Sequence, residues 1–114
     1  MIGNIVNKTS IEYITPLTKC SMINHVALSS TQGSYTNFTV NQGDLLVYVY
    51  ENGSAYGISG NFMTKVSQNI ITGSVADGYL QILEARYDGT IRFKCNKASS
   101  TGYVVQFRIE EDDS

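Results

Sequence analysis

The side chains best suited to nucleophilic or metal chemistry are one histidine, His25, and two cysteines, Cys20 and Cys95. A histidine can accept the proton of a nearby thiol and leave a nucleophilic thiolate. However, no catalytic motif surrounds either cysteine, and a zinc site needs either four Cys or His ligands or three with a water. We therefore predict no catalytic residue, no metal site and no cofactor.

Carboxylate pairs could hydrolyse glycosidic bonds, and Asp77 or Asp88 could bind calcium. The candidates are scattered along the chain at Asp44, Glu51, Asp77, Glu84 and Asp88. All except Glu84 stand in turn-like segments, where carboxylates commonly cap backbone N–H groups. The glycine-rich stretch 53–60 lacks the lysine and the helix of a phosphate-binding loop. These patterns favour a protein that is not an enzyme.

The remaining surface chemistry is that of Tyr, Asn, Ser, Thr and Gly, which binding surfaces commonly use. Tyrosine rings can stack on sugar rings, and amide groups can bond to sugar hydroxyls. We predict a ligand-binding patch that combines Tyr35 with Asn52 and Tyr56. The alternative is that these tyrosines are half-buried strand residues whose hydroxyls reach water.

Size and charge limit the possible partners. The 114 residues fit a single domain, 1–114, with 42% hydrophobic and 16% charged residues and a net charge of −2. An acidic tail at 110–114 is expected to be frayed. The one basic cluster, Arg92, Lys94 and Lys97, favours a solvated sheet face over a nucleic-acid site.

The sequence also bears on the compartment. No stretch approaches the roughly 18 apolar residues that span a bilayer. The first residues lack the basic start and apolar run of a secretory signal. We expect no membrane insertion, synthesis in the cytoplasm, and free thiols, with a Cys20–Cys95 disulfide as the alternative.

A two-residue period dominates the chain and predicts β-strands. Ile91, Phe93 and Cys95 alternate with Arg92 and Lys94, so one face of this strand is expected to be buried.

Other segments give the remaining strands. In 103–109, the apolar residues at odd positions are expected to face the core, whereas 45–50 is apolar throughout and predicts a central strand covered on both faces. The segment 79–87 is expected to end in a hairpin turn at Asp88-Gly89. Weaker strands are predicted at 11–17, 23–28, 35–40, 55–58, 62–66 and 70–75, with a turn at 76–78. The fold class is all-β, an antiparallel β-sandwich (jelly-roll or Ig-like) of about 8 strands.

The run YTNFTVNQGDLLVYVY at 35–50, the Gly-rich turns after it and the closing strand GYVVQFRI at 102–109 resemble small β-sandwich modules of phage virions. Those modules form tail-fibre tips, head fibres and capsid decorations. The resemblance covers residues 20 to 109. It implies a homo-oligomer, commonly a trimer, displayed on a virion and contacting a capsid or tail protein or a surface glycan. It transfers no functional residue.

Our leading interpretation is thus a virion structural or host-adhesion module that self-assembles. A stand-alone carbohydrate-binding or cell-surface module is a second interpretation. A small cytosolic inhibitor protein, acting through the acidic tail, is a third.

Overall fold

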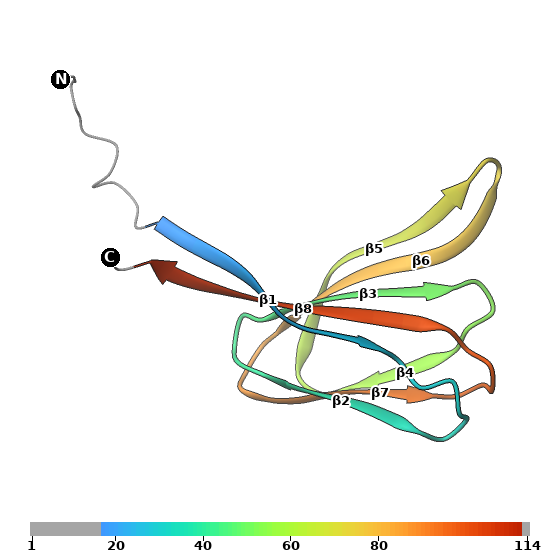
Figure 1. Ribbon diagram of the computed structural model, residues 1–114, viewed down its shortest axis with the longest axis horizontal. Helices are drawn as coiled ribbons and strands as arrows, with labels where there is room; N and C mark the ends of the chain where they lie inside the picture. The colour runs from blue at the N-terminus through green and yellow to red at the C-terminus, as the bar shows by residue number, and fades with distance from the viewer. Residues whose placement is uncertain (1–16, 113–114) are drawn as a thin grey trace.

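The protein is built from strands and turns over residues 17–112, the part of the chain that this computed structural model describes. Eight antiparallel strands form two packed sheets, which confirms the predicted all-β sandwich (Figure 1). The strands are β1 (Leu17–Ala27), β2 (Tyr35–Val40), β3 (Leu45–Glu51), β4 (Tyr56–Ser59), β5 (Phe62–Thr72), β6 (Val75–Ala85), β7 (Gly89–Cys95) and β8 (Gly102–Asp112).

The two layers differ in size. The large sheet has five strands in the order β1-β8-β3-β6-β5, and the small sheet has three in the order β2-β7-β4. β3 is therefore the middle strand of the large sheet, as its apolar sequence predicts. Val47 on β3 stands opposite Val105 on β8 and Ile82 on β6, so the three side chains share one face.

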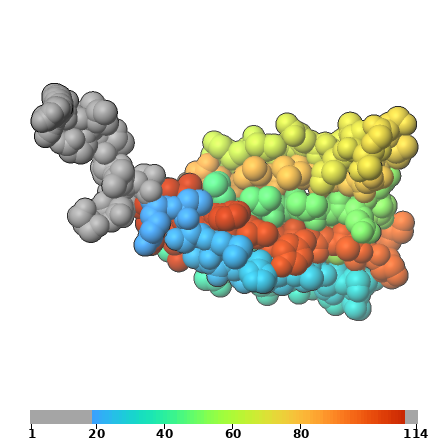
Figure 2. Space-filling model, turned by 45° about the horizontal axis from the view of Figure 1, so that its top comes forward, coloured from blue at the N-terminus to red at the C-terminus, as the bar shows by residue number. Residues whose placement is uncertain are grey.

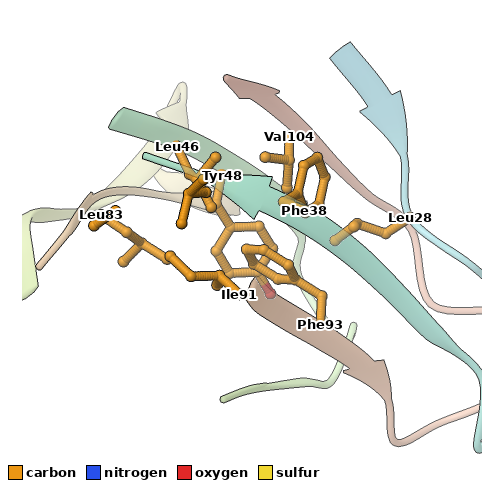
Figure 3. Close-up of a cluster of buried hydrophobic side chains, with 10 residues drawn as sticks. Leu28, Phe38, Leu46, Tyr48, Leu83, Ile91, Phe93 and Val104 are labelled. Atoms are coloured by element: carbon orange, nitrogen blue, oxygen red, sulfur yellow. The ribbon is translucent and has the colours of Figure 1, made fainter. Parts of the chain in front are cut away.

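The core lies between the sheets, where the inward side chains of both layers meet (Figure 3). Tyr48 and Phe93 pack with ring centroids 5.0 Å apart, and Phe38 meets Phe93 edge-on at 5.5 Å. Removing such a buried ring typically costs about 3–5 kcal/mol. The other buried hydrophobic members are Leu28, Val40, Leu46, Leu83, Ala85, Ile91 and Val104.

The predicted burial of β7 is confirmed. Ile91, Phe93 and Cys95 are buried, while Arg92 and Lys94 are exposed on the opposite face of the small sheet. Both cysteines that the sequence offers are free thiols, with Cys95 buried and Cys20 exposed.

The predicted orientation of β8 is wrong. Val104 and Gln106 point into the core, so Tyr103 and its odd-numbered neighbours face away from the small sheet. The physical reason is that β8 pairs with β3 in the register that sets Val104 against buried Tyr48. Alternation fixes which residues share a face, but not which face is covered.

Two predicted turns are also wrong. Asp88-Gly89 does not close a hairpin, because β6 pairs with β3 and β5 while β7 pairs with β2 and β4. The chain crosses between the sheets there. The turn predicted at 76–78 instead lies at Gly73-Ser74, between the paired residues Thr72 and Val75.

Gly78 therefore belongs to β6 and serves close packing instead of a turn. A Cβ at this position would lie 2.7 Å from the backbone oxygen of Tyr50 on β3. A side chain there would push the two strands apart.

The ends of the chain differ from expectation as well. β8 continues to Asp112, and Glu110 pairs with Lys19 on β1, so residues 110–112 belong to a paired strand. The strand predicted at 11–17 lies outside the described residues except for Leu17.

One charged group is held inside the sandwich. Asp44, only 1% exposed, accepts hydrogen bonds from Arg108 Nε at 2.9 Å and Nη2 at 2.8 Å. Its carboxylate also accepts from Gln106 Nε2 and from the Asn41 backbone N–H, each at 2.9 Å. Gln106 donates further to the backbone oxygen of Thr39 at 3.0 Å. This network ties the turn between β2 and β3 to β8.

The network controls the protonation of Asp44. Burial by itself raises the pKa of this carboxyl, but the hydrogen bonds from Arg108, the Asn41 N–H and Gln106 outweigh it and hold the pKa below its usual value. The folded state therefore binds this proton less readily than the unfolded chain does. The resulting stabilisation is present above the unfolded pKa of about 3.9 and is lost as pH falls through the lower folded pKa.

Asp44→Asn should lower the free energy of unfolding at pH 7 by about 3 kcal/mol, because Arg108 loses its buried partner. It should also reduce the loss of stability between pH 7 and pH 3. Urea denaturation at fixed protein concentration measures both effects. The matched control is Asp77→Asn, an exposed carboxylate expected to change stability by less than about 0.5 kcal/mol. Equal effects of the two variants would contradict the role given to Asp44.

Candidate interaction surfaces

The three residues of the predicted ligand patch do not form one surface. Tyr35, 52% exposed, pairs with exposed Lys94 and so lies on the outward side of the small sheet. Tyr56 pairs with buried Cys95 and points to the opposite, inward side. Asn52 is exposed in the turn after β3, where its amide donates to the backbone oxygen of Ala76 at 3.3 Å. The patch as predicted is therefore not assembled, because strand alternation separates its two tyrosines.

Tyr56 is held by the fold. Its hydroxyl donates to the backbone oxygen of Ser29 at 2.9 Å, and its ring meets Tyr48 edge-on with centroids 6.2 Å apart. Burial, with a smaller contribution from Cys95, raises the pKa of this hydroxyl. A half-buried, bonded tyrosine matches the alternative interpretation of this residue, a strand tyrosine, although its hydroxyl bonds to the protein.

The candidate nucleophiles are also separated. His25 lies on the outward side of the large sheet, where Nδ1 is 2.7 Å from the Tyr103 hydroxyl. Cys95 is in the core between the sheets and donates to the Lys97 backbone oxygen at 3.1 Å. Cys20 and His25 are on one strand, but five residues of extended chain put them on the order of 15 Å apart. The geometry brings neither thiol to the imidazole.

The carboxylates have local roles. Asp44 is engaged by Arg108, Glu84 forms an ion pair with Lys65 at 3.4 Å, and Asp88 accepts from the Gln42 backbone N–H at 2.8 Å. Within residues 17–112, no three His, Cys, Asp or Glu side chains are grouped as metal ligands would be. The same part of the chain has no helix long and apolar enough to cross a bilayer.

The most unusual feature is the side of the large sheet that points away from the small sheet, which we call the outer sheet face. Paired residues on neighbouring strands carry apolar side chains across its whole width. They are Met22 and Ala27 on β1, Tyr103, Val105, Phe107 and Ile109 on β8, Leu45, Val47 and Val49 on β3, Leu80 and Ile82 on β6, and Met63, Val66 and Ile70 on β5.

No described segment covers this face. Figure 2 shows the five strands as adjacent bands, from β5 (yellow) through β3 (green) to β1 (blue), with no other described segment across them. Met22 is 57% exposed and Ile109 is 50% exposed. The aliphatic residues in the middle, such as Val47 and Val105, are half-buried by their neighbours alone.

A shallow groove lies at one end of the outer sheet face. Its volume is about 330 Å³, and Val49, Ile70 and Tyr103 supply much of its apolar lining. It forms where β3 ends at Glu51, while β5 and β6 continue beyond it as a hairpin (Figure 1). Glu51 and Asp77 also line the groove.

Sequence reasoning found the residues of this face but misplaced them. It assigned the odd positions of 103–109 to the core and interpreted β3 as covered on both sides. The signal that could have corrected it is Gln106 with Arg108 on the even side of β8, because these residues can satisfy a buried Asp44. Two polar residues at alternate positions of a strand can face the core when a buried carboxylate accepts their hydrogen bonds.

The role of Tyr56 can be tested by removing its hydroxyl. Tyr56→Phe should reduce the free energy of unfolding by about 1 kcal/mol, because the Ser29 carbonyl loses its donor. Tyr35→Phe is the matched control, since none of the hydrogen bonds described for residues 17–112 involves its exposed hydroxyl. Urea denaturation measures both. No difference between the variants would show that the Tyr56 bond contributes nothing.

Comparison with known proteins adds no assignment to these surfaces. The chain matches no model of a known family, no curated protein and no solved structure.

Proposed function

We propose that this chain is a self-assembling structural module of the phage-virion type that its sequence resembles, and that its outer sheet face packs against the same face of other copies. The observation that carries the proposal is the apolar surface that extends over all five strands of the large sheet, with His25, Gln68 and Glu84 among its polar residues. Monomeric soluble proteins rarely expose a contiguous apolar patch of more than a few hundred Å².

The outer sheet face is large enough for a stable interface. Five strands spaced about 4.8 Å apart, with about 3.3 Å per residue along strands of 7 to 11 residues, span on the order of 600–800 Å². A standard protein interface buries about 800 Å² on each partner. Covering this face alone therefore approaches the area that specific association requires.

The chemistry of the face favours a second copy as its occupant. Its centre is made of Val, Leu, Ile and Phe side chains on a pleated surface, and such surfaces interdigitate when two sheets pack. The acidic residues at paired positions of this face are Glu84, which is bonded to Lys65, and Glu51, which lies at the end of β3 beside the groove. The centre of the face therefore carries no unpaired acidic charge, so the same faces of neighbouring copies can meet there without charge repulsion.

The virion resemblance supports the same conclusion and suggests three copies around an axis. The inhibitor interpretation keeps only its argument from small size, because residues 110–112 belong to β8 and pair with β1.

A charge at the centre of the face should dissociate the assembly. Val47→Glu places a carboxylate on the middle strand, where each interface would bury it unpaired at a cost of about 3 kcal/mol, or roughly 150-fold in the dissociation constant. Native mass spectrometry and sedimentation equilibrium should show wild-type oligomers, with three copies expected, and monomeric Val47→Glu.

The control is Thr39→Glu, an exposed strand position on the outward side of the small sheet, which should leave the oligomer intact. Wild-type protein that stays monomeric at high micromolar concentration would contradict the proposal. So would a Val47→Glu variant that is folded and still assembled.

A further inference from the structure

The outward side of the small sheet has a different chemistry from the outer sheet face. Tyr35 on β2 stands opposite Lys94 on β7, and Asn37 stands opposite Arg92, so the four side chains share this side. The Arg92 guanidinium lies 5.8 Å from the centroid of the Tyr35 ring, and Lys94 Nζ lies 5.7 Å from it. We call Tyr35, Arg92 and Lys94 the basic platform.

Hydrogen-bonding groups surround the basic platform. Ser59 on β4 stands opposite Arg92, and Gly57 stands opposite Lys94. The Asn96 amide occupies the space beside Gly57, because a Cβ there would lie 2.9 Å from Asn96 Nδ2. Because Gly57 has no side chain, the Asn96 amide can lie at this position, next to Lys94.

The cations of the basic platform have no acidic partner in the described part of the chain. The ion pairs found there are Lys65–Glu84 and Arg108–Asp44. Arg92 and Lys94 stand two residues apart on one side of β7, where like charges repel. No acidic residue occupies the strand positions facing this side. A bound anion would relieve the repulsion.

We infer that the basic platform binds a carboxylated sugar of a surface polysaccharide. The Arg92 guanidinium can bond a carboxylate in bidentate fashion, with Lys94 supplying a second charge. Tyr35 is 52% exposed, and the part of its ring that the two cations leave open can contact the C–H side of a pyranose ring. Asn37, Asn96 and Ser59 supply donors and acceptors for hydroxyls.

A nucleic-acid strand fits the basic platform less well. Proteins that bind single strands follow the phosphate backbone along a positively charged groove with several stacking rings. Here two cations and one ring lie on an open sheet, in a chain with a net charge of −2. The site matches one charged ring with hydroxyls rather than a chain of phosphates.

This inference goes beyond assembly, and its site lies on the opposite side of the sandwich from the outer sheet face. The test is a titration of ¹⁵N-labelled full-length protein with trigalacturonic acid, followed by NMR. Amide shifts should change along β2 and β7. Arg92→Gln and Tyr35→Ala should each weaken binding at least about tenfold, because each removes a principal contact. The fully methyl-esterified trisaccharide should bind at least about tenfold more weakly.

Arg86→Gln is the matched control, because Arg86 is an exposed cation after β6 and outside the basic platform. It should bind like wild type. The inference is overturned if the acid causes no shifts along β2 and β7, if the methyl ester binds equally well, if Arg86→Gln weakens binding as much as Arg92→Gln, or if oligo(dT) binds as tightly as the acid.

The titration is repeated on Val47→Glu, whose platform is unchanged. If Val47→Glu binds trigalacturonic acid, in whatever oligomeric state, the sugar site does not depend on the proposed assembly. Circular dichroism of each variant confirms that it is folded, so that lost binding reports on the basic platform itself.

Discussion

A strand sends alternate side chains to opposite faces of its sheet, and the rest of this structure depends on that constraint acting on β3. Both faces of β3 are apolar, yet the small sheet can cover only one of them. Leu46 and Tyr48 take the inward side and join the core, while Val47 and Val49 are left on the outward side. Because β8 and β6 pair with β3 in register, their apolar residues extend the uncovered surface into a face of its own. The two sides of the sandwich then differ in chemistry, one aliphatic and one polar and basic.

The buried Asp44 network helps to fix which side of β8 faces inward. With the even positions inside, Gln106 and Arg108 bond the carboxylate that precedes β3. With the odd positions inside, Phe107 and Ile109 would enter the core, but Asp44 would lose three hydrogen bonds from side chains. Leaving a buried carboxylate unpaired costs several kcal/mol. The same interaction therefore stabilises the core and leaves the apolar side of β8 available for contact with other copies.

Much of the fold could be predicted from the sequence, because alternation and turn residues are local signals. The β7 pattern gave the buried side of Ile91, Phe93 and Cys95 correctly, and β3 was identified as a central strand. The pairing between strands that are far apart in the sequence was harder to predict. Asp88-Gly89 has the composition of a hairpin turn, yet the chain crosses there between sheets, which no local signal reveals. Tyr35 and Tyr56 have similar surroundings in the sequence but point to opposite sides of the small sheet, since their strands pair with β7 in registers that only the assembled sheet defines.

The central claim, that other copies cover the outer sheet face, is tested most directly by oxidative footprinting of Met22 and Met63. In the isolated fold these methionines are 57% and 39% exposed. The account predicts that both are oxidised much more slowly in wild-type protein than in the Val47→Glu variant, whereas Tyr35, on the outward side of the small sheet, is modified equally in the two. Equal oxidation of Met22 and Met63 in the two proteins would show that the face is open to solvent and would contradict the account.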